Sequence, residues 1–82
     1  MEDEQEIGIV RDYFAKVCVA AIELSSELSI GESIHIKGHT TDIMQKVDSM
    51  QIDRKEIKKA SAGDSVGIKV KDRVRPGDKV YK

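Results

Sequence analysis

The chain has 82 residues, which predicts a single domain with a thin core, because so short a chain buries only about 60% of its unfolded surface. With one phenylalanine, two tyrosines and no tryptophan, the core must be aliphatic. The single cysteine excludes an internal disulfide and fits a reducing, cytoplasmic setting. The start MEDEQE is not that of a signal peptide, and no apolar stretch approaches the ~20 residues that span a bilayer, so we expect no membrane contact.

The net charge of -1 conceals an uneven distribution. Residues 1–45 hold three basic and nine acidic side chains, a balance of -6, whereas residues 46–82 hold eleven basic and six acidic ones, a balance of +5. Such a split is typical of a positive face that meets an anionic partner. The alternative is that both signs interleave on the folded surface, since a barrel brings distant segments together.

The first segments of the chain predict a flexible acidic tail over residues 1–6 and a single β domain over residues 7–82. The first strand is expected from Ile7 to Phe14 and the second from Lys16 to Leu24. A helix over Phe14–Leu28 is the competing interpretation, because Ala, Glu and Leu favour helices. We favour strands because no helix cap precedes the β-type residues Val17, Cys18, Val19 and Ile22.

The middle of the chain predicts two further strands. In a connection from Ser25 to Gly31, two apolar residues are expected to close one end of the barrel, namely Leu28 and Ile30. The third strand, Ser33–Lys37, alternates apolar and polar side chains. The fourth is expected from Ile43 to Asp53, and its inward phase slips at Asp48-Ser49, which predicts a β-bulge.

The last third of the chain predicts one helical turn over Lys55–Ala60, a fifth strand over Asp64–Lys71 and a final strand over Lys79–Tyr81. Pro76-Gly77 is a strong turn signal between the last two. The fold class is therefore all-β, a small six-stranded antiparallel β-barrel. Its core is expected to contain Ile34, Ile36, Met50, Ile52, Val66, Ile68 and Val70.

No catalytic or metal-binding pattern stands out. His35 and His39 are four residues apart, but on a strand and a turn this spacing does not define a metal site. Cys18 lies between two valines, which favours a buried structural thiol over a reactive one. There is no glycine-rich loop of the GxxxxGK[ST] type. We expect no metal, no cofactor and no enzymatic activity.

Basic side chains between the fourth and fifth strands are the best candidates for a binding site. Four of them lie within six residues, namely Arg54, Lys55, Lys58 and Lys59. A secondary basic patch extends them, formed by Lys69, Lys71, Arg73 and Arg75. Such residues neutralise phosphates, whereas aromatic residues that stack on bases are scarce. The pattern therefore predicts contact with an RNA backbone or an RNA end.

The sequence resembles the second domain of translation elongation factor Tu. The stretches that carry the likeness are LSIGESIHIKGHTTDIMQKVDSMQI, EIKKASAGDSVGIKVK and RPGDKVY, and together they span nearly the whole chain. That domain is a six-stranded barrel that helps to bind the 3′ end of aminoacyl-tRNA. The resemblance implies that Gln51 takes the place of a glutamate near the terminal adenosine, with Arg54 and Lys55 as the basic pair beside it. Asp53 stands where the family has a phenylalanine.

A second resemblance is to the small C-terminal barrel of collagenase-like peptidases. It rests on Gly31-Glu32-Ser33-Ile34 and on Val74-Arg75-Pro76-Gly77-Asp78. The GTPase and third domains of the elongation factors and the catalytic portion of the peptidases are missing from this sequence. Neither GTP hydrolysis nor peptidase activity is therefore implied.

We therefore expect a non-enzymatic module of the translation machinery that binds tRNA, rRNA or other RNA. The alternative is a protein-interaction module that docks on a separately encoded GTPase or RNA-related enzyme. A monomer or a weak homodimer would be consistent with either interpretation.

Overall fold

The computed structural model describes residues 4–82, and all regular structure in that range is β-strand. Ten strands follow one another along the chain, and no helix occurs among the described residues. They are β1 (Glu6–Phe14), β2 (Val19–Leu24), β3 (Leu28–Ser29), β4 (Ser33–Lys37), β5 (Asp42–Lys46), β6 (Met50–Ile52), β7 (Lys55–Ile57), β8 (Lys59–Ala60), β9 (Ser65–Lys69) and β10 (Lys79–Tyr81). None of the described residues forms a helix long and apolar enough to cross a membrane.

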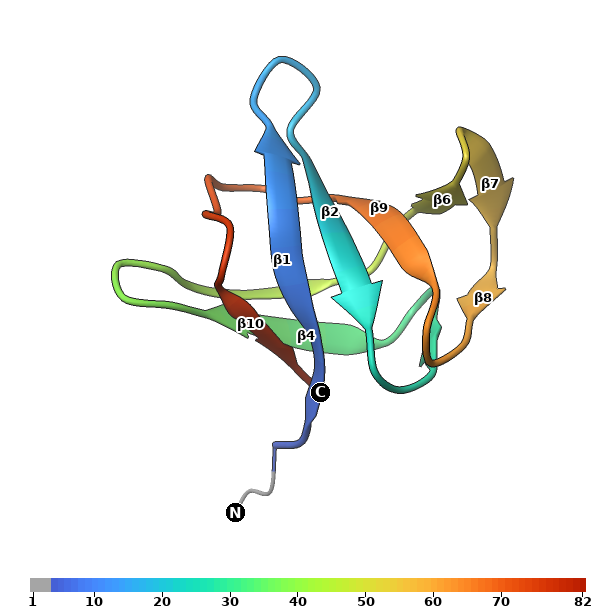
Figure 1. The fold of residues 1–82 in the computed structure, drawn as a ribbon, viewed down its shortest axis with the longest axis horizontal. Coiled ribbons are helices and arrows are strands. Elements are labelled where there is room, and N and C mark those ends of the chain that lie inside the picture. The colour runs from blue at the N-terminus through green and yellow to red at the C-terminus, as the bar shows by residue number, and fades with distance from the viewer. Residues whose placement is uncertain (1–3) are drawn as a thin grey trace.

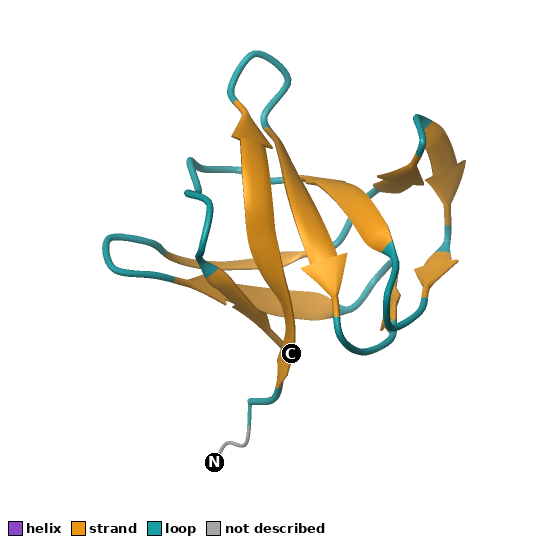
Figure 2. Ribbon diagram, in the orientation of Figure 1, coloured by secondary structure: helices purple, strands orange, loops and turns teal. Residues whose placement is uncertain are grey.

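Eight of the strands form one antiparallel sheet in the order β5-β4-β10-β1-β2-β9-β6-β7, and β3 pairs with β8 in a separate two-stranded sheet. The large sheet curls around the core into a half-barrel whose two edges are β5 and β7 (Figures 1 and 2). This arrangement confirms the predicted all-β antiparallel fold class. The short strands β3, β7 and β8 were not foreseen from the sequence.

A glutamine side chain bridges the open side of the half-barrel. Gln45 on β5 donates from Nε2 to the carbonyl of Lys69, and its Oε1 accepts the backbone N–H of Lys71, both at 2.9 Å. These two hydrogen bonds thus take the place of backbone pairing between β5 and the end of β9. They join two segments that are separated by most of the sheet in strand order.

The core is aliphatic, as the composition predicts. It is filled by alternate residues of the long strands, for instance Ile22 and Leu24 of β2 and Ile34 and Ile36 of β4, all at most 2% exposed. Of the seven core residues expected from the sequence, six are buried and Ile52 is partly buried against the cluster. Leu28 closes the core as expected, whereas its predicted partner Ile30 is 40% exposed.

Three turns of the half-barrel share one design, in which glycine is followed by an acidic residue. Gly31, Gly63 and Gly77 have φ angles of 96°, 93° and 96°, a region that glycine adopts without strain. The acidic side chain that follows each glycine accepts the N–H of the residue that opens the turn. These bonds are Ser29 to Glu32, Ser61 to Asp64 and Arg75 to Asp78, each at 2.9 Å.

The region between β5 and β9 differs most from the prediction. The expected fourth strand is two strands, because β5 pairs with β4 while β6 crosses to pair with β9 and β7. The slip at Asp48-Ser49 is therefore a break between strands and not a bulge. The helical turn expected over Lys55–Ala60 is also wrong, because β6 and β7 form a tight hairpin and β8 follows.

Both ends of the first hairpin also depart from expectation. Lys16 belongs to the turn between β1 and β2, and the second strand begins only at Val19. Cys18 lies in this turn with a φ of 57° and is exposed, so the predicted buried thiol is wrong.

The predicted flexible tail falls partly on residues 1–3, which lie outside the described residues. Gln5 exchanges backbone hydrogen bonds with Lys82, and Glu6 begins β1. The tail therefore does not extend to these two residues.

Candidate binding groove

A hollow lies on the outer face of the sheet, where β2, β9 and β6 are neighbours. Its lining residues come from the β1–β2 hairpin, from β9 and from the β6–β7 hairpin, elements that can be followed in Figure 1. We call it the β9 groove, and its volume is about 610 Å³. Its lining consists of Phe14, Lys16, Val17, Val19, Ala21, Gln51, Asp53, Arg54, Ser65, Val66 and Gly67.

Small residues in register form the floor of the β9 groove. Gly67 in the middle of β9 pairs with Ala21 of β2 on one side and with Gln51 of β6 on the other. A Cβ atom added to Gly67 would lie 3.2 Å from Val19 Cγ1, closer than most real contacts. Gly67 has no positive φ, so the missing side chain admits the close approach of Val19 and does not serve a turn. Val19, Ala21 and Gly67 together form an apolar floor.

One wall of the groove carries apolar side chains that folding leaves in solvent. Phe14 is 50% exposed and Val17 is 58% exposed, at the end of β1 and in the turn that follows. Val17 N–H bonds to the carbonyl of Phe14, and the carbonyl of Cys18 accepts Val70 N–H at 2.8 Å. These hydrogen bonds fix the β1–β2 turn, so that Phe14 and Val17 form one wall of the groove. Exposed apolar side chains that share one hollow are typical of a binding surface.

The opposite wall is the tip of the β6–β7 hairpin. Its two central residues, Asp53 and Arg54, have φ angles of 52° and 67°, the pattern of a two-residue hairpin turn that asparagine and glycine usually fill. Lys16 and Arg54 are the cations that line the groove, and Asp53 is its one anion. Within residues 4–82, neither Lys16 nor Arg54 forms an ion pair. The groove is therefore apolar with an excess of positive charge at its rim.

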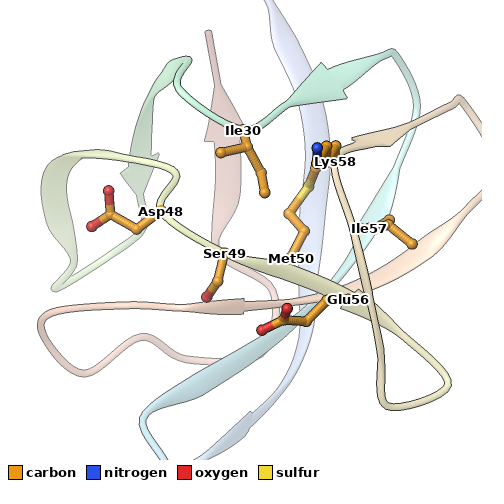
Figure 3. A pocket seen from close by; sticks show the side chains of 7 residues that line it. All are labelled: Ile30, Asp48, Ser49, Met50, Glu56, Ile57 and Lys58. Atoms are coloured by element: carbon orange, nitrogen blue, oxygen red, sulfur yellow. The ribbon is translucent and has the colours of Figure 1, made fainter.

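The basic residues predicted as a site do not form one surface. Gln51 and Arg54 line the β9 groove, whereas Lys58 lines a second hollow of about 240 Å³ (Figure 3). Lys55 is exposed at the start of β7, and Lys59 lies 3.8 Å from Glu27 in a solvated ion pair. The predicted residues are thus divided between two hollows and exposed positions.

The second hollow is bounded by apolar and charged groups. Ile30 and Met50 contribute the apolar part, while Asp48, Glu56 and Lys58 contribute charges of both signs. In Figure 3 the Asp48 side chain points away from the other labelled residues. Because both signs are present, this hollow does not favour an anion.

The secondary basic patch is also divided. The backbone of Lys69 and Lys71 is tied to Gln45, and both side chains are exposed. Arg73 and Arg75 line a third hollow of about 450 Å³ together with acidic residues, Asp42 and Asp72. Charges of both signs again surround the predicted cations. This agrees with the alternative that acidic and basic side chains interleave on the folded surface.

His35 lies between two carboxylates. Its Nδ1 is 2.6 Å from Glu4 Oε2 and its Nε2 is 2.5 Å from Asp42 Oδ1, and its side chain is 15% exposed. The hydrogen bonds to Asp42 and then to Glu4 raise the pKa of His35 above its usual value. His39 lies in the exposed turn after β4 and takes no part. Among the described residues, no cluster of three or more acidic, histidine or cysteine side chains could hold a metal ion.

The sequence reasoning identified Gln51 and Arg54 but missed the apolar half of the groove. Phe14, Val17 and Val19 were assigned to strands or to the interior, since their exposure depends on where the first turn lies. Gly67 was the available signal, because a glycine in the middle of a central strand often marks a close approach.

Comparison with known proteins relates this chain to peptidases. Over 77 residues, or 93% of the chain, it is 47% identical to an uncharacterised protease of Methanocaldococcus jannaschii. Over 72 residues, or 85% of the chain, it is 43% identical to a collagenase of Porphyromonas gingivalis. The chain spans about a fifth of the length of these relatives, at 19% and 20%. No family model matches the chain.

Solved structures agree on the fold. The C-terminal domain of a Geobacillus thermoleovorans protein described as a U32 peptidase superposes with a TM-score of 0.90, covering 95% of this chain and 99% of that one. A second structure of this domain gives a TM-score of 0.88. The identities are 18% and 17%, so these structures establish the half-barrel architecture alone.

These comparisons correct the expected function. The chain is similar to a domain of collagenase-like peptidases, which confirms the second resemblance, and none of the comparisons reported above supports elongation factor Tu. A translation-factor-like module that binds tRNA or other RNA is therefore wrong. The expected lack of enzymatic activity is contradicted too, because the relatives are named protease and collagenase, although only a fifth of each is matched.

Proposed function

We propose that this half-barrel works as one domain of a collagenase-like peptidase and holds polypeptide beside a catalytic portion. The observation that supports the proposal is identity of 47% and 43% to segments of a protease and a collagenase, across most of the chain. Each relative has about four fifths of its length outside the matched segment. Similarity at this level favours a common role as well as a common fold.

The β9 groove gives the half-barrel a means to hold polypeptide. A concave, mostly apolar surface with a few polar groups is the usual form of a binding site, and its volume of about 610 Å³ lies in the range of such sites. The enzyme partner expected from the sequence is, in this proposal, the catalytic portion of the peptidase. That portion can lie in the same polypeptide or in another one.

An exchange of domains tests the proposal. The segment of the Porphyromonas gingivalis collagenase that matches this chain would be deleted in one variant and replaced by residues 4–82 in another. We expect the deletion to lose most activity on collagen and the replacement to restore it. A second replacement, with an unrelated β-barrel of similar size, controls for the mere presence of a folded domain.

Two results would contradict the proposal. One is a deletion variant that stays folded and as active as the intact collagenase. The other is a replacement variant that is folded, as judged by its melting transition, yet no more active than the control barrel. Either would show that the half-barrel does not contribute to peptidase action.

A further inference from the structure

We propose that the β9 groove binds a segment of polypeptide substrate in which an apolar side chain is followed by a carboxylate group. The apolar side chain would sit on the floor formed by Val19, Ala21 and Gly67, between the two walls, and the carboxylate would meet Arg54 at the rim. This inference rests on the proposed function and adds to it the site and the chemistry of the bound segment.

The apolar part of the inference follows from side chains that folding leaves without a partner. Phe14 and Val17 are 50% and 58% exposed, although both border a hollow whose floor is Gly67 and Ala21. At Gly67 the strand has no side chain because Val19 Cγ1 comes within 3.2 Å of where a Cβ would lie. Val19, Ala21 and Gly67 thus make an apolar floor between the walls, of the kind that an apolar group from another molecule covers.

The carboxylate part of the inference follows from charge. Lys16 and Arg54 lie on opposite walls of the groove, and within residues 4–82 neither is paired with an anion. The groove holds one carboxylate of its own, that of Asp53. The remaining positive charge is complementary to one carboxylate on the bound segment. An arginine also binds a carboxylate through two parallel hydrogen bonds, which fixes its orientation.

The backbone at Arg54 points to the same conclusion. Its φ of 67° is uncommon for any residue but glycine, asparagine or aspartate, and it strains the backbone at this position. A glycine at this place in the hairpin would form the turn without strain. Arginine is therefore less favourable than glycine for the stability of this turn. Backbone strain of this kind is found where a side chain takes part in binding.

Titration with labelled peptides tests the inference. The probe is a short fluorescent peptide in which leucine is followed by glutamate, with matched peptides that carry glutamine for glutamate or glycine for leucine. Binding to the full chain would be measured by fluorescence anisotropy. We expect saturable binding of the probe and about tenfold weaker binding of each matched peptide, the effect of one charged hydrogen bond or one apolar contact.

The decisive variant is Arg54→Gly. It should weaken binding of the leucine-glutamate peptide about tenfold while the melting temperature stays the same or rises, because glycine relieves the turn. Lys46→Gln is the matched control, since it removes one exposed cation of β5 outside the groove and should leave binding unchanged.

Four results would overturn the inference. They are no saturable binding of the probe, equal binding of the glutamine peptide, an Arg54→Gly variant that binds as well as the parent, and saturable binding of an oligoribonucleotide in place of the peptides. None of these requires the catalytic portion of a peptidase. Failure here with a successful domain exchange would therefore leave the proposed function standing with another binding surface.

Discussion

His35 shows how a single side chain ties the start of the described chain to the half-barrel. Its two ring nitrogens face Glu4, which precedes β1, and Asp42, which begins β5. Protonation makes both nitrogens donors to carboxylates, which is why the pKa of His35 is raised. A group whose pKa is higher in the folded than in the unfolded state stabilises the fold at low pH and loses that effect as pH rises.

The first prediction is a loss of folding stability as the pH rises, caused by deprotonation of His35. The contribution of His35 should be fully present below its unfolded pKa of about 6.5 and disappear as the pH rises through its raised folded pKa. In His35→Gln this part of the pH dependence should be absent, whereas His39→Gln should keep it. Urea unfolding of the three proteins from pH 5.5 to 8.5 measures it. Identical pH profiles for the parent and His35→Gln would show that the histidine is not held in this way.

The second prediction concerns a core residue. Ile68 of β9 is fully buried, and Ile68→Ala should lower the free energy of unfolding by about 2–5 kcal/mol. That is a large share of the stability of a small domain. Met44→Ala, at a side chain that is 62% exposed, is the control and should change little. A loss at Ile68 no larger than at Met44 would mean that β9 is not central to the core.

Among the strands and turns, features that depend on a few neighbouring residues could be predicted better than features that depend on pairing between distant strands. The turn at Gly77 and the strand Ser33–Lys37 follow from the Pro76-Gly77 pair and from strict alternation, which act within a few residues. The break after β5 could not be predicted, because it depends on β6 leaving β4 to pair with β9. The hairpin at Asp53-Arg54 was missed because its residues are not the usual ones for such a turn.

The third prediction concerns the bridge across the open side of the sheet. Gln45→Ala removes hydrogen bonds to the backbone of Lys69 and Lys71 and should cost about 1 kcal/mol for each. Gln51→Ala is the matched control, because Gln51 is an exposed glutamine on β6, which is not adjacent to β5 in the sheet. Hydrogen exchange should also be faster at the Lys71 amide in Gln45→Ala. Equal stabilities of the two variants would mean that the bridge adds nothing to the fold.

For the whole molecule, fold and site were predictable to different degrees. Aliphatic composition and regular turn spacing predicted an all-β antiparallel domain, whereas the site depends on which distant segments border one hollow. Arg54 and Gln51 were identified, but Lys58 and Lys59, close to them in sequence, lie elsewhere. The predicted function was wrong because unrelated functions share a barrel fold, whereas identities of 47% and 43% relate this chain to peptidases.

The most direct test of the peptidase role is the KM of the exchanged collagenase on a long and on a short substrate. If the half-barrel holds polypeptide beside the catalytic portion, deletion should raise KM for denatured collagen about tenfold and leave a short fluorogenic peptide unaffected. Replacement by residues 4–82 should restore the lower KM. Equal KM values for the intact, deleted and replaced enzymes on denatured collagen would contradict the account.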